Sequence, residues 1–256
     1  RGISFSVQDG EIVGIVGESG SGKTMTALTI AGLFKEHAVL DAGTIRLDGT
    51  DLLKLTEREM RQVQGNRIGM IFQEPMTALN PTMKIGRQVE EVLRLHTDLD
   101  SRARKAAVIR ALEEVELDEA EKLLFKYPHE LSGGMRQRVM IAAAMICRPS
   151  LLIADEPTTA LDAATQESIL KLLKKLNDKY GMSILFISHN LRVVKELCTR
   201  VFVMKDGEIL EEGETEVVFQ NPKTEYTKAL IAAIPARVGE NPYYEMLKQK
   251  AGRQYD

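Results

Sequence analysis

Apolar runs of strand length alternate with stretches of helical periodicity along most of the chain. Helical spacing of apolar positions at residues 165–180 and 191–198 predicts two amphipathic helices. Continuous apolar runs around them predict buried strands, at residues 12–16, 68–72, 151–154, 183–188 and 201–204. Strands that alternate with helices form parallel sheets with right-handed crossovers. We therefore expect an α/β fold with a parallel sheet flanked by helices.

Shorter alternating patterns predict an antiparallel β portion beside this sheet. Residues 3–7 alternate apolar and polar positions, as do residues 44–47, which run into an Asp-Gly pair. A second Asp-Gly pair at 206–207 leads into residues 208–210 and predicts a β-hairpin. We expect a strand at each of these places.

A long insertion between the strands has helical periodicity alone. Between Ile85 and about Leu124 there is no strand pattern. Two apolar faces recur there, the first with Val89, Val92, Leu93 and Leu95 and the second with Val108, Ile109, Leu112 and Val115. We predict one domain in which residues 1–84 and 131–213 form the core, 85–130 form an inserted helical subdomain, and 214–256 form a C-terminal extension.

Composition narrows the function classes. A net charge of -3 over 256 residues argues against a nucleic-acid binder that depends on a broad basic surface. No apolar run has the length of a membrane span, and no signal peptide is visible. Cys147 and Cys198 show no metal spacing, so buried free thiols in a reducing, cytosolic setting are expected. Because the first residue is Arg1 rather than Met, we expect the natural N-terminus to lie upstream.

The strongest chemical signal is a glycine-rich loop between a predicted strand and a predicted helix at 25–33. Its sequence fits the pattern G-x-x-x-x-G-K-[ST], with Gly17, Glu18, Ser19, Gly20, Ser21, Gly22, Lys23 and Thr24. Such a loop turns its N–H groups inward at a helix N-terminus and so holds an anion. Lys23 adds a positive charge for the β- and γ-phosphates, and the Thr24 hydroxyl can bind Mg²⁺. The alternative to a phosphate-binding loop is a glycine-rich turn with an incidental lysine. The predicted strand and helix on either side make this alternative less favoured.

Two carboxylates follow the buried run at 151–154. Asp155 suits the Mg²⁺ shell, and Glu156 suits a general base that orients or deprotonates water. Neighbouring side chains on a strand point to opposite faces, which allows this division of roles. Surface acids at a strand end are the alternative. Gln73 and His189 also end predicted strands, and each alone would be more typical of a structural residue.

A further stretch, Leu-Ser-Gly-Gly-Met-Arg-Gln-Arg at 131–138, decides between these alternatives. With it the sequence resembles the ATP-binding cassette (ABC) ATPases from about residue 3 to 213. The motifs of that family occur in order: the phosphate loop 17–24, the Q-loop Gln73, the signature 131–135, the Walker B stretch 151–156, the D-loop 160–162 and the switch His189. The resemblance implies a P-loop NTPase fold, ATP and Mg²⁺ as ligands, Glu156, His189 and Gln73 as catalytic residues, and Thr24, Gln73 and Asp155 at the metal.

The resemblance also implies that two cassettes sandwich ATP, with the signature of one facing the phosphate loop of the other. The signature residues Ser132, Gly133 and Gly134 open a predicted helix, so they offer a hydroxyl, free N–H groups and a positive dipole end to a γ-phosphate. Their lobe differs from that of Lys23, which is a reason to expect a second chain. A Ser-Gly-Gly linker with a helix cap is the alternative. Met135 replaces the usual signature Gln without implying lost activity.

Two stretches resemble one branch of the family, the oligopeptide, dipeptide and nickel importers. They are the Q-loop extension at 73–81 and the segment from 221 to 235, which alone would be as typical of a helix-capping linker. The resemblance implies integral-membrane permease subunits, an external solute-binding protein, and a peripheral place on the cytoplasmic face of the membrane. Because this branch usually pairs two different cassettes, we expect a heterodimer, although two copies of this chain would also complete the sandwich.

Two departures from the family pattern bear on ligands. The aromatic residue that stacks on adenine lies well before the phosphate loop in this family, so we expect it upstream of Arg1; Phe5 is too close to Gly17. The tail at 240–256 has no cysteine, so no iron–sulfur site is expected.

Two other classes of function remain as alternatives: a non-transport ABC ATPase acting on nucleic acid or ribosomes, and a binding module with an inactive site. No coiled-coil arm or second cassette supports the former, and the intact motifs disfavour the latter.

Overall fold

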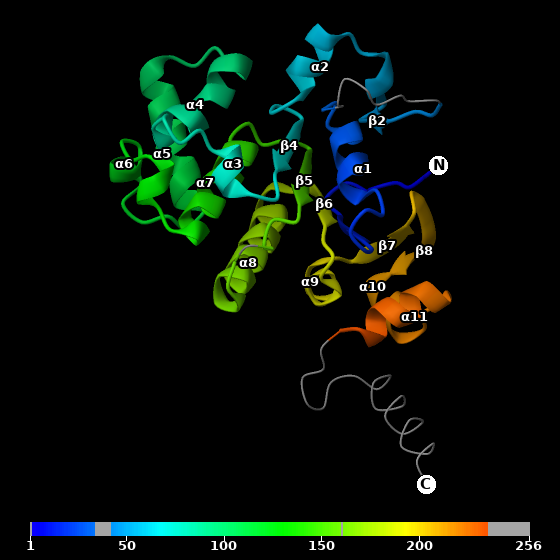
Figure 1. The fold of residues 1–256 in the computed structure, drawn as a ribbon. Coiled ribbons are helices and arrows are strands. Elements are labelled where there is room, and N and C mark those ends of the chain that lie inside the picture. Colours follow the sequence, from blue (N-terminus) through cyan, green and yellow to red (C-terminus); the bar gives the residue numbers. More distant parts are fainter. Residues whose placement is uncertain (1, 34–41, 160, 235–256) are drawn as a thin grey trace.

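The computed structural model describes residues 2–33, 42–159 and 161–234, and places a mixed sheet at the centre of the molecule (Figure 1). The strand order is β4-β5-β6-β1-β7-β8, in which the first five strands are parallel and β8 is antiparallel to β7. The strands are β1 (Ile12–Val16), β4 (Ile68–Ile71), β5 (Leu151–Asp155), β6 (Ser183–Ile187), β7 (Arg200–Lys205) and β8 (Glu208–Glu214). The parallel sheet predicted from the apolar runs is confirmed.

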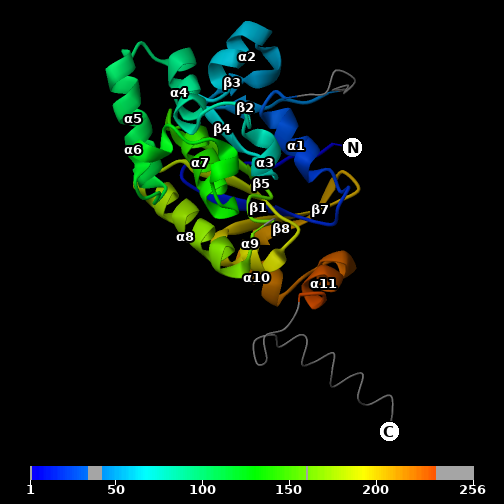
Figure 2. The same ribbon diagram turned by 60° about the vertical axis from the view of Figure 1, so that its left-hand side comes forward.

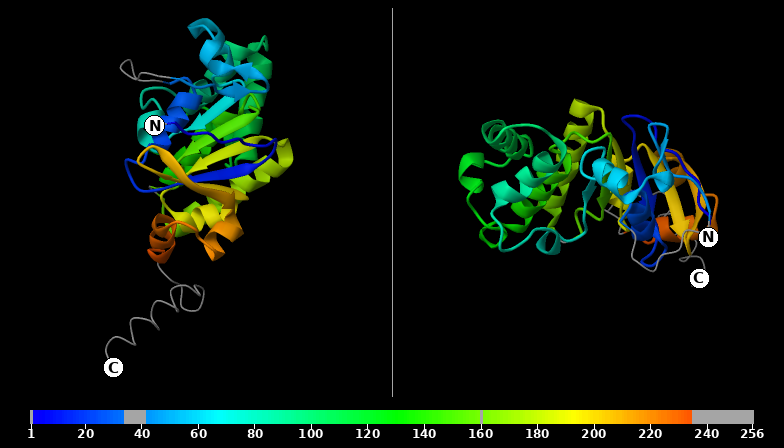
Figure 3. Two further views of the ribbon diagram at one scale, coloured as in Figure 1. Left: turned by 90° about the vertical axis from the view of Figure 1, so that its right-hand side faces the viewer. Right: turned by 90° about the horizontal axis from the view of Figure 1, so that it is seen from above.

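Alternate residues of the central strands pack into two separate apolar cores, one on each face of the sheet. In β1, Ile12 and Val16 belong to one core, whereas Val13 and Ile15 belong to the other. Helices α1 (Lys23–Ile30) and α2 (Glu57–Val63) cover the face of Val13. Helices α8 (Ala163–Tyr180) and α9 (Leu191–Leu197) cover the opposite face, so the sheet is buried on both sides (Figure 3).

The antiparallel portions form where the Asp-Gly pairs predicted them. Strands β2 (Arg46–Leu47) and β3 (Thr50–Asp51) pair across Asp48-Gly49, and β7 and β8 pair across Asp206-Gly207. Both residues of each pair have positive φ, as a two-residue hairpin turn with the favoured twist requires.

The prediction of a strand at residues 3–7 is wrong. Residues 2–8 pack Ile3, Phe5 and Val7 against the core but form no sheet ladder.

A helical region without strands lies beside the sheet (Figure 2). It contains α4 (Ile85–His96), α5 (Ser101–Glu114) and α6 (Ala120–Leu123), which pack with α7 (Gly133–Met145). Gly69 on β4 lets α7 approach the sheet, because a Cβ there would lie 2.2 Å from the Ala144 carbonyl oxygen. The prediction that Leu95 shares the buried face of α4 is wrong, since it is 68% exposed. Leu95 lies two residues after the buried Leu93, roughly 200° farther round the helix, so its side chain turns to solvent.

Shorter elements complete the described chain. They are η1 (Leu52–Lys54), α3 (Pro75–Ala78), η2 (Pro128–Glu130), α10 (Thr215–Gln220) and α11 (Glu225–Ala232). Cys198 is buried, as predicted, whereas Cys147 is only partly buried. The predictions for Ala160 and for the tail at 240–256 lie outside the described residues. The subdomain boundaries at 84, 130 and 213 stay predictions.

Candidate nucleotide site

The glycine-rich loop connects β1 to α1 and encloses the end of the Lys23 side chain. Gly17 must be glycine, because a Cβ there would lie 2.1 Å from the Met204 carbonyl oxygen. Gly22 is the N-cap of α1 at φ 104°, a left-handed conformation that glycine adopts without strain. The loop therefore wraps onto the first turn of α1, where free N–H groups and the helix dipole favour an anion.

The Lys23 ammonium lies inside this loop. Its Nζ donates to the carbonyl oxygens of Gly17 at 2.8 Å and Glu18 at 2.7 Å, and to Ser21 Oγ at 3.3 Å. Burial lowers the pKa of Lys23, and the carboxylates of Glu156 and Asp155 oppose that shift. A buried cation held by neutral oxygens is a strong site for phosphate, because phosphate supplies the charge that the oxygens lack.

Thr24 and Asp155 come together beside the loop. The Thr24 hydroxyl donates to Asp155 Oδ1 at 3.2 Å. Burial raises the pKa of Asp155, while the hydrogen bond from Thr24 opposes the shift. A hydroxyl and a carboxylate are oxygen ligands of the kind that Mg²⁺ prefers, with water and phosphate oxygens completing its shell. Among the described residues, no group of three or more His, Cys, Asp or Glu side chains could hold a metal ion.

Glu156 is held by side chains from neighbouring strands. Its Oε2 accepts from Gln73 Nε2 at 3.4 Å, and His189 Nδ1 lies 3.0 Å from the same oxygen. These residues follow β5, β6 and β4, which are adjacent in the sheet, so its carboxyl-end edge brings them together. In the described contacts Gln73 joins Glu156 and not the Thr24–Asp155 pair.

The direction of Glu156 does not come from strand alternation. Its φ is 47°, in the left-handed region, and its N–H donates to the Ile187 carbonyl oxygen at 2.9 Å. A turn that begins directly after Asp155 thus aims the second carboxylate. The Thr159 hydroxyl, in the same turn, donates to Glu156 Oε2 at 2.9 Å. Thr159 belongs to none of the sequence motifs; the signal for it is a hydroxyl residue three positions after a carboxylate at a strand end.

The signature residues lie at the start of α7, which packs with the helical region. Ser132 is the N-cap of α7 and its Oγ accepts from the Met135 N–H at 3.3 Å, while Gly133 and Gly134 form the first turn. Within the described residues no hydrogen bond joins them to the phosphate loop, and α7 lies among the helices of the helical region (Figures 1 and 2). The structure does not bring the two halves of the predicted site together in one chain.

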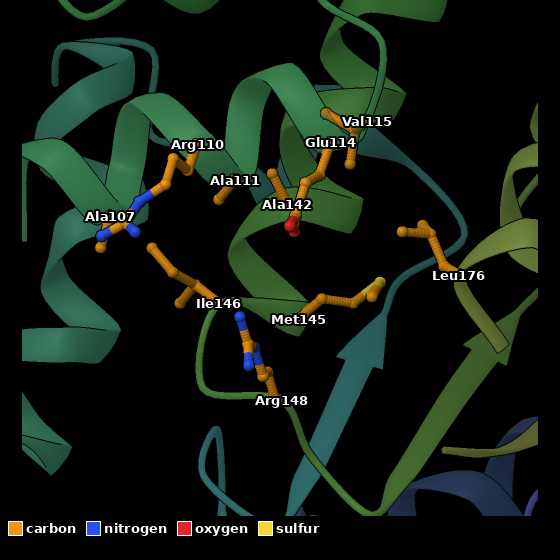
Figure 4. Close-up of a pocket in the computed structure, with 10 residues that line it drawn as sticks. All are labelled: Ala107, Arg110, Ala111, Glu114, Val115, Ala142, Met145, Ile146, Arg148 and Leu176. Carbon is orange, nitrogen blue, oxygen red and sulfur yellow. The ribbon is translucent and has the colours of Figure 1, made fainter. Parts of the chain in front are cut away.

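The Phe5 ring and a cavity between three helices both lie outside the site. Phe5 packs on Phe202 with ring centroids 5.1 Å apart, so its ring is part of the core. A cavity of about 140 Å³ lies between α5, α7 and α8, with Arg110, Glu114 and Arg148 at its wall (Figure 4). None of its lining residues belongs to the phosphate loop or to the Glu156 group.

The sequence profile of the ABC transporter family matches residues 1–159, more than half of the chain. The chain belongs to the ABC transporter family. It carries the ATP-binding part of such a transporter, and the ABC ATP-binding proteins are ATPases. Within the described residues, no helix combines the length and the apolar content that crossing a membrane requires.

Individual relatives cover nearly the whole chain. A protein of Sinorhizobium fredii, named probable peptide ABC transporter ATP-binding protein y4tR, is 47% identical over 92% of this chain and 71% of its own length. Glutathione import ATP-binding protein GsiA of Shigella dysenteriae is also 47% identical over 92% of this chain, which spans only 39% of GsiA. The solved dimer of the ATP-binding cassette MJ0796 with ADP and Pi matches with a TM-score of 0.75 and 31% identity, over 84% of this chain and 90% of MJ0796.

Proposed function

We propose that the chain is the ATP-hydrolysing subunit of an ABC importer for peptides or related small solutes. The observation that carries the proposal is the position of Glu156, held beside the buried Lys23 and the Thr24–Asp155 pair. The names of the relatives, which describe peptide and glutathione import, support the solute class. They do not favour the alternative of an ABC ATPase that acts on nucleic acid or ribosomes.

In this function the loop of residues 17–24 binds the phosphates of ATP. Its N–H groups hold the β-phosphate, and Lys23 exchanges the carbonyl oxygens of Gly17 and Glu18 for β- and γ-phosphate oxygens. Thr24, Asp155 and Gln73 would hold Mg²⁺, which neutralises charge that develops on the phosphate oxygens. The oxygen pair of Thr24 and Asp155 fits that role; Gln73 must turn from Glu156 to reach it.

Glu156 then acts on the attacking water. Among the described residues, the hydrogen bonds from Gln73 and Thr159 and the contact with His189 all fall on its Oε2. Oε1 is left to orient the water and to accept its proton as the oxygen attacks the γ-phosphorus. The bond from the γ-phosphorus to the bridging oxygen breaks, and ADP leaves with that electron pair. His189, half exposed at the same edge, can donate a hydrogen bond to the γ-phosphate.

A second cassette completes the site. The start of α7 offers the Ser132 hydroxyl and the N–H groups of Gly133 and Gly134, but within the described residues it makes no bond to the chain's own phosphate loop. The partner is a second copy or, as we infer for this branch, a different cassette. The cassette MJ0796 is known as a dimer. Permease subunits would hold the pair at the cytoplasmic face of the membrane, and an external solute-binding protein would deliver the solute.

The proposed role of Glu156 is tested by replacing it with glutamine, which has nearly the same shape. Glu156→Gln keeps the hydrogen-bonding amide oxygen but cannot accept a proton, so we expect Mg-ATP binding within about threefold of the original and turnover lowered at least about 100-fold. Binding is measured with a fluorescent ATP analogue and turnover by phosphate release. Glu167→Gln, on the exposed outer side of α8, is the matched control and should keep full activity. Full turnover in Glu156→Gln would refute the assignment.

A further inference from the structure

A single peptide unit of the phosphate loop is held from both sides. The Gly17 carbonyl oxygen accepts from Lys23 Nζ at 2.8 Å. The Glu18 N–H, at the other end of the same peptide bond, donates to the Tyr226 hydroxyl at 3.0 Å. The described chain has no cis peptide bonds, so the carbonyl and the N–H of this unit point to opposite sides. Lys23 therefore holds its inner side and Tyr226 its outer side.

Tyr226 reaches the loop from α11, in the C-terminal segment beyond the sheet. The α11 N-terminus is anchored on Glu211 of β8, a carboxylate that is only 6% exposed. Glu211 accepts from the Lys223 N–H at 2.8 Å and from the Thr224 N–H at 3.1 Å. Thr224 caps α11 by accepting from the Thr227 N–H at 3.1 Å. Two oxygens of one buried carboxylate thus fix the helix start, and with it the direction of Tyr226.

The Tyr226 ring is fixed as well. Lys205 Nζ lies 4.8 Å from the ring centroid, over its face, where a cation is attracted to the aromatic ring. The next turn of the same hairpin touches the phosphate loop directly, because the Gly207 N–H donates to the Ser21 carbonyl oxygen at 2.9 Å. Burial raises the pKa of Tyr226, and its hydroxyl oxygen accepts the Glu18 N–H through a lone pair.

We propose that Tyr226 is a positioning residue of the nucleotide site, and that Glu211 makes the C-terminal segment a support of the phosphate loop. Holding the Glu18 N–H sets the rotation of the Gly17–Glu18 peptide. That rotation turns the Gly17 carbonyl inward, where it holds the Lys23 ammonium until phosphate oxygens replace it. Because the N–H points out of the loop, phosphate does not compete for it. The segment prepares the loop for nucleotide without touching the nucleotide.

The proposal rests on the nucleotide role of residues 17–24, and its test separates the two. Tyr226→Phe removes only the acceptor, while Tyr180→Phe is the matched control, since the Tyr180 hydroxyl bonds Glu114 on the helical region. We expect the Glu18 amide of the nucleotide-free Tyr226→Phe chain to exchange hydrogen at least about threefold faster by NMR. The Kd for a fluorescent ADP analogue with Mg²⁺ should rise about 3- to 10-fold, the size of one lost hydrogen bond. Tyr180→Phe should change neither.

Glu211→Gln tests the anchor. An amide group cannot accept both N–H groups as the carboxylate does, so this variant should weaken nucleotide binding by a similar factor. In the double variant with Tyr226→Phe the two losses should not add, because both act through the same hydrogen bond. If the unchanged chain binds no nucleotide, the proposed site itself is wrong. If it binds, and Tyr226→Phe matches Tyr180→Phe in both exchange and Kd, or binds more tightly, the positioning role of Tyr226 is refuted.

Discussion

At the scale of single residues, the geometry separates the two acids of the Asp155-Glu156 pair. Asp155 is the last residue of the strand and accepts a hydrogen bond from the Thr24 hydroxyl. Glu156 lies beyond the strand end at φ 47°, where it accepts hydrogen bonds from Gln73 and Thr159 and contacts His189. A non-glycine residue in this region is strained, and such strain persists where its surroundings hold it in place. Hydrogen bonds from Gln73 and Thr159, with His189 Nδ1 3.0 Å from the same oxygen, provide that restraint.

Thr159 should matter to turnover more than to binding. Thr159→Val keeps the shape of the side chain but removes the hydroxyl that donates to Glu156 Oε2 at 2.9 Å. We expect kcat for ATP hydrolysis to fall about 3- to 10-fold with little change in KM, because one hydrogen bond that orients the proposed base is lost. Steady-state phosphate release measures both constants. Thr159→Ser should restore kcat, and a Val variant as active as the Ser variant would contradict the orienting role.

At the scale of elements, ion pairs connect the helical region to the long helix α8. Glu116 pairs with Lys175 at 2.9 Å and Glu114 with Lys179 at 2.9 Å, while a third pair, Glu116 with Arg138 of α7 at 3.1 Å, lies within the helical region. These pairs are partly exposed, so each contributes little to stability alone. The docking of α11 is different, because it depends on the buried carboxylate of Glu211.

The docking of α11 should weaken in acid. Burial raises the pKa of Glu211, but hydrogen bonds from Thr227 and from the N–H groups of Lys223 and Thr224 outweigh burial, so the pKa is lowered from 4.5. A lowered folded pKa stabilises the protein above the unfolded pKa, and that stability is lost as the pH falls from about 4.5 through the folded value. We expect the Tm difference between the original chain and Glu211→Gln to be largest near pH 7 and to shrink below about pH 4.5. A constant difference from pH 7 to pH 3 would show that the charge of Glu211 is not what anchors the helix.

At the scale of the whole molecule, the chain presents two half-sites on different parts of its surface. The phosphate loop and Glu156 lie at the edge of the sheet, and Ser132 lies at the start of α7 in the helical region. This separation agrees with the proposed sandwich of two cassettes, in which the nucleotide would lie between Ser132 of one cassette and the phosphate loop of the other.

Blocked hydrolysis should therefore trap the assembly. With Mg-ATP, Glu156→Gln should shift from monomer to dimer in light scattering, alone or with a partner cassette, because the γ-phosphate that joins Ser132 to the opposite Lys23 is retained. Adding Ser132→Arg should abolish the dimer, since the bulky cation takes the place of the serine contact. ADP in place of ATP is the control and should leave monomers. An inactive Glu156→Gln chain that stays monomeric with every partner cassette would contradict the sandwich.

Local sequence was enough for much of this fold and for the place of the phosphate loop between a strand and a helix. The apolar runs that become β1, β4, β5, β6 and β7 are buried on both faces, so their burial signal is continuous and easily recognised. The Asp-Gly turns act within a few residues and were equally predictable. The phosphate loop is also local, since strand, loop and helix are consecutive in the chain.

The tertiary structure decided what depends on distant segments. Residues 2–8 have the alternation of a strand yet join no ladder, because pairing depends on a neighbour that the local pattern does not reveal. The turn at Glu156 and its contacts with Gln73 and His189 depend on the order of β4, β5 and β6. Tyr226 lies 208 positions from Glu18, and only the folding of α11 onto Glu211 brings its hydroxyl to the phosphate loop. A hydrogen bond between segments so far apart leaves no periodic trace in the sequence, because periodicity reports burial within one element and not the identity of the partner.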